Sequence, residues 1–158
     1  DALSESKYPY RMPRYLKAGH IDMNFLLQEF QAFWRENSEI WVKRYAYEEA
    51  APHLILQAFL QRVVNGGGRI IREFAAGRNR LDLCVEFEGQ KYPVELKIRY
   101  SSKTEEKSYS QLIGYMDTLG VKEGWLIIFD RRPDIDWDTK IYLKTETVED
   151  TTVVIIGC

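Results

Sequence analysis

The segment GRNRLDLCVEFEGQKYPVELK, residues 77–97, decides the fold that the rest of the chain is expected to adopt. It contains two runs in which apolar and polar residues alternate, joined by a short turn centred on Gly89. Successive side chains of a strand point to opposite faces, so Leu83 and Val85 are expected on one face and Asp82 on the other. The segment therefore predicts a β-hairpin with two distinct faces.

Two carboxylates of this hairpin, Asp82 and Glu95, are expected to lie near each other. If the loop consists of residues 89–90, Asp82 lies opposite Lys97, and Cys84 lies opposite Glu95. The two acids are then diagonal neighbours with Cα atoms roughly 7–8 Å apart, a separation that one divalent ion can bridge. A longer loop or a bulge would change this pairing, and a slip by one residue would move one polar set to the opposite face.

At these residues the sequence resembles the PD-(D/E)XK nuclease superfamily, whose signature is an Asp at the bend of one strand and Glu-x-Lys on the next. Asp82 and Glu95-Leu96-Lys97 match it, with Leu81 in place of the optional proline. The resemblance implies Mg²⁺ or Mn²⁺ held by Asp82, Glu95 and the Leu96 carbonyl, and hydrolysis of phosphodiester bonds in DNA. Lys97, expected to be partly buried, would orient or deprotonate the attacking water. A surface ion-pair cluster of little energetic value is the alternative.

A helix from about Glu48 to Asn65 precedes the hairpin, and Pro52 must lie in its first turn. Its expected buried positions include Leu54, Leu56, Phe59, Leu60, Val63 and Val64. Glu49 and His53 are four residues apart and share a helix face. On their own they are a capping acid and a half-buried histidine. In related nuclease families an acid at this place completes the metal site, which implies a catalytic and metal-binding role for Glu49 and a nucleic-acid contact for His53. Glu48 is a rival for the acid.

A helix from about Glu106 to Leu119, closed by Gly120, follows the Glu-x-Lys strand. Gln111 and Tyr115 share one of its faces. Gln-x-x-x-Tyr after Glu-x-Lys recurs as a fourth motif in part of the superfamily, so the resemblance implies that Gln111 positions Lys97 or the phosphate and that Tyr115 contacts nucleic acid. Without that support, Gln111 is a surface residue and Tyr115 a core aromatic.

The order of predicted elements indicates one α/β domain. A helix from Met23 to about Glu36, capped by Asp22, is followed by the helix at 48–65, three strands, the helix at 106–119 and an apolar strand at 125–129. Strands at 140–148 and 151–156 add a hairpin or a sheet extension. This order resembles the restriction-endonuclease-like αβββαβ core of the superfamily over about 48–130, and the resemblance implies a mixed sheet. Residues 1–21 are expected to be a linker or a surface arm, and residues 22–158 the nuclease-like domain.

Charge is spread unevenly along the chain. The net charge is −2, but residues 61–103 contain nine Arg or Lys against five acids. A local basic face on an acidic body suits a phosphate backbone, and Arg78, Arg80 and Arg99 are the candidate contacts. Ordinary solvated strand edges are the alternative.

The remaining features concern location and context. No run of eighteen apolar residues and no leader is present, and the two cysteines form no framework, which together predict a cytoplasmic protein without a membrane partner. The stretches at residues 49–70 and 114–132 are also similar to the C-terminal domain of predicted bacterial AAA-like ATPases. Because the chain starts at Asp1, we expect a fragment of a longer protein whose ATPase module is elsewhere. A non-catalytic nucleic-acid-binding or interaction module of the same fold is the alternative function.

Overall fold

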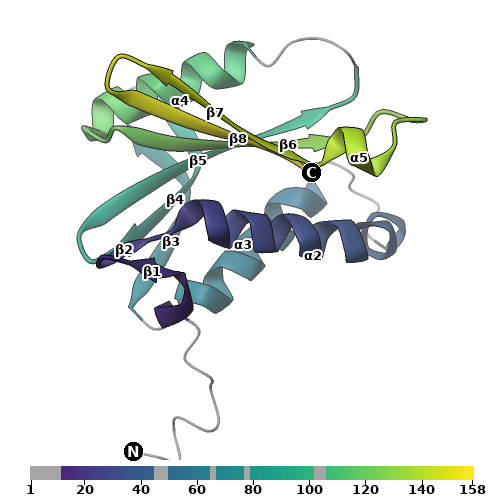
Figure 1. The fold of residues 1–158 in the computed structure, drawn as a ribbon, viewed down its shortest axis with the longest axis horizontal. Coiled ribbons are helices and arrows are strands. Elements are labelled where there is room, and N and C mark those ends of the chain that lie inside the picture. The colour runs from purple at the N-terminus through teal and green to yellow at the C-terminus, as the bar shows by residue number, and fades with distance from the viewer. Residues whose placement is uncertain (1–11, 45–49, 65–66, 77–78, 102–105) are drawn as a thin grey trace, which may run out of the picture.

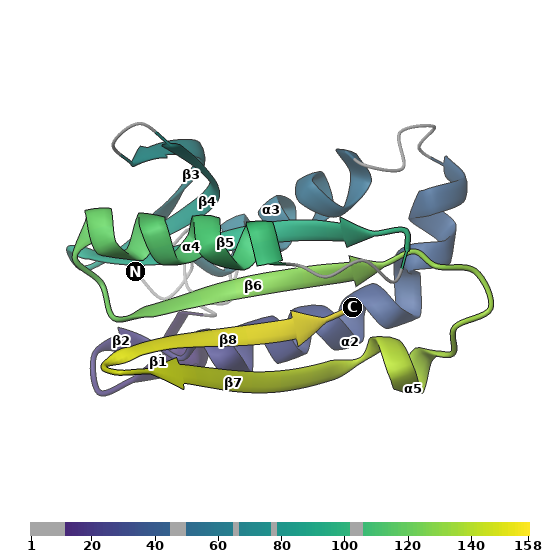
Figure 2. The same cartoon turned by 90° about the horizontal axis from the view of Figure 1, so that it is seen from above.

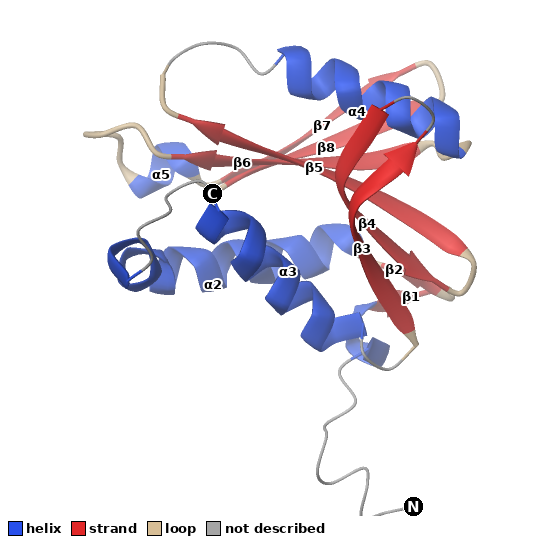
Figure 3. Ribbon diagram, turned by 180° about the vertical axis from the view of Figure 1, so that it is seen from behind, coloured by secondary structure: helices blue, strands red, loops and turns tan. Residues whose placement is uncertain are grey.

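The computed structural model describes residues 12–44, 50–64, 67–76, 79–101 and 106–158. One helical layer, α4, covers one face of a central sheet, while α2 and α3 cover the other (Figure 1 and, from behind, Figure 3). In chain order the elements are η1 (Met12–Tyr15), β1 (Leu16–Lys17), β2 (His20–Ile21), α2 (Met23–Arg44), α3 (Ala50–Val64), β3 (Gly68–Ala76), β4 (Asn79–Phe87), β5 (Gln90–Arg99), α4 (Glu106–Leu119), β6 (Glu123–Asp130), α5 (Trp137–Lys140), β7 (Tyr142–Val148) and β8 (Thr151–Gly157).

The main sheet is mixed, which confirms the predicted fold class. Its six strands lie in the order β3-β4-β5-β6-β8-β7. Strands β3, β4 and β5 form an antiparallel meander, β6 pairs in parallel with both β5 and β8, and β7 closes the edge as an antiparallel partner of β8 (Figure 2). Parallel neighbours need a crossover connection, and α4 supplies it between β5 and β6. The predicted order of helix, three strands, helix and strand is therefore present from α3 to β6.

The first long helix, α2, is longer than predicted, since it ends at Arg44 and not near Glu36. The Asp22 carboxylate accepts a hydrogen bond from the Phe25 backbone N–H at 3.1 Å, which confirms Asp22 as the N-cap. Residues 37–39, Asn-Ser-Glu, interrupt the apolar pattern directly after Glu36, but none of them is a Gly or Pro, so they are compatible with a continuing helix. Ser38 is in fact buried. Apolar spacing alone thus gave too early an end.

The aromatic stripe of α2 forms part of the core, as expected. Phe30 and Trp34 are buried, and their rings lie 6.1 Å and 4.9 Å from the ring of Phe129 on β6. A buried amide also fastens α2 to the sheet edge, because the Gln31 Nε2 group donates to the carbonyls of Tyr142 and Gly157 at 3.0 Å and 2.6 Å. Helix and sheet are therefore held by both packing and hydrogen bonds.

Helix α3 contributes fewer apolar residues to the core than predicted. Leu56, Leu60 and Val64 recur every four residues and are buried, with Pro52 in the first turn as expected. Leu54, predicted to be buried, is 49% exposed, because it lies on the other side of the helix from that stripe. The predicted ends at Glu48 and Asn65 lie outside the described residues.

The β4–β5 turn differs from the expected one by one position. Phe87 pairs with Gln90, so the loop consists of Glu88 and Gly89, both with positive φ (51° and 75°), and not of Gly89 and Gln90. Two consecutive residues with positive φ are typical of the tight hairpin turn that matches strand twist. Cys84 consequently pairs with Pro93, and the expected pairing with Glu95 is wrong. Each pairing partner changes by two residues, so every side chain keeps its predicted face.

The segments at the two ends of the chain also pack on this body. Residues 12–21 form a short arm whose Tyr15 and Ile21 are buried against α2 and the sheet. At the other end, β7 and β8 form the predicted hairpin and also extend the sheet through β6. Among the residues that the structure describes, no helix has the length and hydrophobicity needed to cross a membrane.

Candidate functional site

The pairing of β4 with β5 stops at Leu83, the residue that follows Asp82 in the sequence. Leu83 and Val94 are the last paired residues, and the Asp82 carboxylate then accepts a hydrogen bond from the Leu96 backbone N–H at 2.9 Å. A side chain thus takes the place that a strand carbonyl would occupy in a continuing ladder. The strand diverges at Asp82, as expected for the first acid of the motif, and Asp82 lies beside Glu95 in place of Lys97.

Glu95 is buried on the face that α4 covers, with 6% of its surface exposed. Burial, together with charge repulsion from the neighbouring Asp82 carboxylate and a hydrogen bond shared with it, raises the pKa of its carboxyl group to about 9. Its Oε2 atom is buried and has no hydrogen-bond partner among the residues that the structure describes. A buried polar atom without a partner destabilises a fold, so this oxygen points to a missing proton donor or cation.

The donor set fits a hard divalent cation. Two carboxylates in contact carry a charge that a divalent ion neutralises, and Mg²⁺ prefers such oxygen ligands. Because the N–H and C=O groups of a strand residue face the same neighbour, the Leu96 carbonyl points toward the side on which Asp82 lies. Within the described residues no three His, Cys, Asp or Glu side chains gather as a metal centre. Glu49, the expected third acid, and its rival Glu48 lie outside those residues.

Lys97 lies on the same strand as Glu95 and shares its parity, as the motif requires. Its side chain is exposed, so the partial burial predicted for it is wrong. It makes no ion pair with Asp82 or Glu95 in the described part of the chain. The ammonium group is therefore able to approach a ligand at the site from solvent.

Helix α4 covers the site face of the hairpin. Its Leu112 and Met116 pack with Cys84 of β4 in a second core cluster that also takes in residues of β6 and β8. Tyr115 belongs to the same cluster and is 2% exposed, so its ring has no exposed face for a nucleic acid. Gln111 is exposed on the same helix. The structure thus agrees with the core interpretation of Tyr115 and leaves Gln111 accessible near the site face.

The other candidate contacts are spread over several elements. His53 is half-buried on α3, and the side chain of Arg80, at the start of β4, lies outside the described residues together with all of Arg78. Arg99 ends β5, where its Nε group donates to the Ser101 carbonyl at 3.1 Å. Among the candidate contacts for nucleic acid, Arg99 is thus the cation whose side chain is described, two residues beyond Lys97.

One polar cluster near this strand end was missed at the level of sequence. The Asp130 carboxylate, 7% exposed at the end of β6, binds Arg132 through its backbone N–H and its guanidinium, with the shortest distance 2.6 Å. Burial raises the pKa of Asp130, but the hydrogen bonds and charge of Arg132 outweigh it and hold the pKa below its usual value. An acid that ends a continuous apolar strand and precedes two arginines was the available signal.

Comparison with solved structures gives a distant match. The structure of Pyrococcus furiosus SfsA in complex with Ca²⁺ has a TM-score of 0.34 and 21% sequence identity, over 51% of this chain and 43% of that chain. This chain therefore corresponds to less than half of that protein. A likeness at this level carries no argument about the site.

Comparison by sequence is more informative about kinship than about activity. None of the curated proteins matches the chain. The model of a family described as "Domain of unknown function (DUF8371)" matches residues 28–132, which run from α2 to the loop after β6 and include every strand of the site. Because that match covers more than half of the chain, the protein belongs to the DUF8371 family.

Proposed function

We propose that this domain is a PD-(D/E)XK-like nuclease that hydrolyses phosphodiester bonds in DNA with Mg²⁺, or with Mn²⁺ in its place. The observation that carries the proposal is the buried Oε2 atom of Glu95, which has no hydrogen-bond partner in the described part of the chain and lies beside a second carboxylate. A core that keeps two repelling acids without a cation loses stability, so a functional reason is required. A divalent ion between Asp82 and Glu95 supplies that reason.

Each residue of the motif has a distinct role in this proposal. Asp82 and Glu95 bind the ion through carboxylate oxygens, with the Leu96 carbonyl and Glu49 as further ligands. When bound, the ion offsets negative charge on the phosphate and makes water a better nucleophile. The hydrogen bond from Leu96 N–H to Asp82 holds that carboxylate in place, which is the orienting role expected of a second layer of contacts.

Lys97 and Gln111 act on the substrate side. Lys97 orients the attacking water, whose oxygen forms a bond to phosphorus while the bond to the sugar oxygen breaks; the water gives up a proton to solvent and the leaving sugar oxygen takes one from solvent, giving a phosphate monoester and an alcohol. Its exposed position suits a group that meets the substrate from solvent. Gln111, exposed on α4, positions Lys97 or the phosphate.

The wider context belongs to the same proposal. Residues 22–158 act as one nuclease-like domain with its core at about 48–130, in the cytoplasm, joined in a longer chain to an ATPase module that uses ATP. Cys84 and Cys158 are both free and buried, which is compatible with a reducing compartment.

A second candidate, a non-catalytic nucleic-acid-binding or interaction module, is favoured by one observation. Because the pKa of Glu95 is raised, one proton shared with Asp82 is enough to remove the repulsion of the pair at neutral pH. In that case the acids stabilise the fold without a metal, and Lys97 contributes only a phosphate contact.

Two substitutions separate these candidates. In the nuclease, Lys97→Ala keeps both metal carboxylates, so Mn²⁺ affinity measured by calorimetry survives, while cleavage falls by about 10²–10⁴-fold. Asp82→Ala abolishes both Mn²⁺ binding and cleavage and leaves folding nearly intact. Lys91→Ala is the matched control, since Lys91 is a partly exposed lysine of the same strand, 3.9 Å from Glu86 and away from the acid pair.

The substrates are plasmid, single-stranded and branched DNA with Mg²⁺ or Mn²⁺. A wild-type protein that cuts none of them, also when joined to the ATPase module, would leave the binding module as the better candidate. Unchanged Mn²⁺ affinity in Asp82→Ala would remove the metal site itself.

A further inference from the structure

The carboxyl ends of the parallel strands β5 and β6 form one continuous surface near the candidate site. The Arg131 backbone N–H donates to the Arg99 carbonyl at 2.8 Å, and the Asp130 N–H donates to the Cys158 carbonyl at 2.8 Å. These bonds hold the residues that follow the two strands in fixed positions. We call residues 97–101 and 130–132 the carboxyl-end rim.

The rim carries an excess of positive charge. Its one acid, Asp130, is outnumbered by four cations, Lys97, Arg99, Arg131 and Arg132. The charge of Asp130 is neutralised by its ion pair with Arg132. The guanidinium of Arg131 is half-exposed and has no ion-pair or hydrogen-bond partner among the described residues. Lys97 likewise has none. Cations at the end of a sheet that also carries the candidate site suit a phosphate chain leading to that site.

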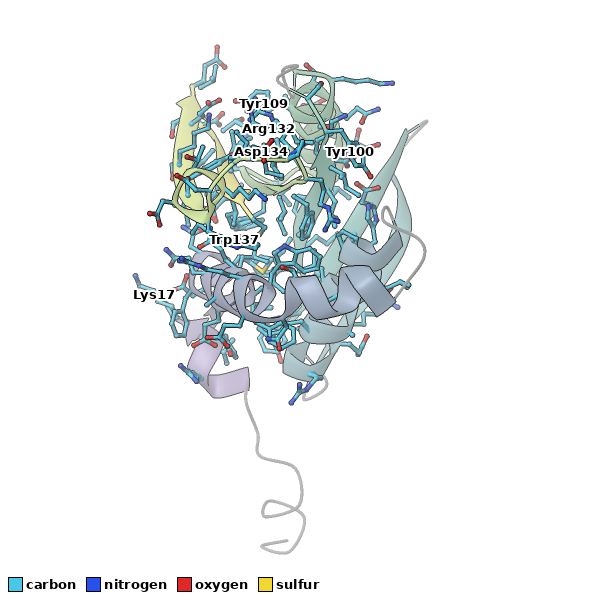
Figure 4. The ribbon with its side chains drawn as sticks, turned by 90° about the vertical axis from the view of Figure 1, so that its right-hand side faces the viewer. Lys17, Tyr100, Tyr109, Arg132, Asp134 and Trp137 are labelled. Carbon is cyan, nitrogen blue, oxygen red and sulfur yellow. The ribbon has the colours of Figure 1, made fainter. Side chains whose placement is uncertain are left out.

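An exposed aromatic ring lies within the same rim. Tyr100 is 47% exposed, and only Leu54 and Val148 are large apolar residues of comparable exposure in the described chain. It follows Lys97 by three residues and lies between Arg99 and Ser101. Figure 4 shows Tyr100 and Arg132 at the same end of the molecule, the end that faces the viewer. The exposed part of its ring is accessible to a ligand.

The acidic stretch that follows the rim limits the surface on one side. Beyond Arg132, every second residue from 134 to 138 is an acid: Asp134, Asp136 and Asp138. Figure 4 shows Asp134 near Arg132. The charge of these acids repels phosphate, so a strand is favoured on the side of Tyr100 and not toward α5. A basic track with an aromatic platform is the combination by which proteins bind unpaired nucleic acid, because a base stacks on the ring only when it is free of its neighbours.

We propose that the carboxyl-end rim binds an unpaired nucleic-acid strand, with a base stacked on Tyr100 and adjacent phosphates bound by Arg131 and Arg99. The inference deepens the proposed nuclease function, on which it rests, by naming the substrate class: DNA with a single-stranded segment next to the bond that is cut. A fully paired duplex lacks an accessible base face and gains only the phosphate contacts.

The test is a binding measurement that does not depend on cleavage. Fluorescein-labelled oligothymidylate of about 12 nucleotides, within the usual site size for such surfaces, is titrated with the whole chain in EDTA, beside a blunt duplex. Tyr100→Ala should weaken single-strand binding about tenfold and duplex binding less than about twofold, while Tyr100→Phe should bind as the wild type does. Arg131→Ala should reduce the slope of log affinity against log salt by about 0.7 on the single strand.

Val148→Ala is the control, since Val148 is 61% exposed on the β7–β8 hairpin and outside the rim. The inference is overturned if Tyr100→Ala binds the single strand as the wild type does. It is also overturned if the affinity of this variant falls equally for the single strand and the duplex, or if the wild type binds neither. If the binding results are as expected but the wild type cuts no DNA, the rim proposal stands and the nuclease proposal is wrong. If the wild type cuts DNA but Tyr100→Ala binds the single strand as tightly as the wild type, the nuclease proposal stands and the rim proposal is wrong.

Discussion

The two faces of the β4–β5 hairpin are both covered by helices, yet they are built differently. On the α2–α3 face, Leu83, Val85 and Val94 are buried among aromatic and aliphatic side chains. On the α4 face, Cys84 is just as fully buried, but Glu95 shares that face with it. The α2–α3 face is an apolar core, whereas the α4 face also contains the ionisable pair Asp82 and Glu95.

The difference shows where stability and function separate in this fold. A buried apolar side chain is stabilised by leaving water, whereas a buried carboxylate without a partner opposes folding. Folds keep such groups mainly where chemistry needs them. The acid pair on the α4 face is therefore expected to respond to substitution with the opposite sign from the apolar residues of the α2–α3 face.

The largest effect is expected on the apolar face. Phe129→Ala removes a ring that packs on Phe30 and Trp34, so the free energy of unfolding should fall by about 3–5 kcal/mol. Urea denaturation followed by tryptophan fluorescence and circular dichroism measures it. Val148→Ala, at an exposed position, should change stability by less than about 0.5 kcal/mol. Equal losses in both variants would mean that this face is not a packed core.

A smaller effect of opposite sign is expected for Glu95→Gln. Because the pKa of Glu95 is raised to about 9 in the folded protein, folding at pH 7 has to protonate this carboxyl group. An amide of the same shape needs no proton, so metal-free protein in EDTA should gain about 1 kcal/mol or more in unfolding free energy. Added Mn²⁺ should raise the Tm of the wild type and not of the variant, because binding to the native state stabilises it.

Glu88→Gln, an exposed acid in the turn, is the control for a change of charge alone. A Glu95→Gln variant that is less stable than the wild type in EDTA would show that the pair is satisfied without a metal. The contrast between the two faces would then lose its functional meaning.

The smallest effect concerns Asp130, a buried acid that has the cationic partner Glu95 lacks. Because Arg132 holds the folded-state pKa of Asp130 below the ordinary value of 3.8, its stabilising contribution is fully present above pH 3.8. That contribution is lost as pH falls through the lower folded-state pKa. Asp130→Asn should therefore be less stable than the wild type at pH 6, with the difference shrinking below pH 3.8.

Thermal unfolding between pH 2.5 and 6 measures this trend. Asp138→Asn, an exposed acid on α5, is the matched control and should show no such convergence. A difference that is constant across this range would mean that Asp130 acts through shape and not through its charge.

Much of the fold was predictable because local periodicity carries it. The alternation at residues 81–98 predicted the two faces of the hairpin, and helical spacing predicted α2 and α4. Gly120, with φ of 70°, ends α4 as expected, since Val121 N–H bonds to the Met116 carbonyl across it. Errors arose where the local signal was ambiguous, as at the end of α2 and at Leu54.

The candidate site was predictable in its residues but not in its surroundings. Either hairpin loop places Gly89 in the turn, so composition does not decide between the two registers, and the observed one brings Asp82 directly beside Glu95. Nor does a strand pattern say what covers a polar face. The burial of Glu95, the exposure of Lys97 and the fork of Asp130 with Arg132 all depend on neighbours distant in sequence or on the end of a ladder.

The sequence by itself determined the order of the elements and the face on which the acids lie. These follow from periods of 2 and 3.6 residues, which are local properties of the chain. Only the tertiary structure decided that α4 buries Glu95, that its Oε2 atom has no partner among the described residues, and that Tyr100 stays exposed beside the basic strand ends. Burial and electrostatic environment are set by contacts between distant segments, and no local pattern contains them.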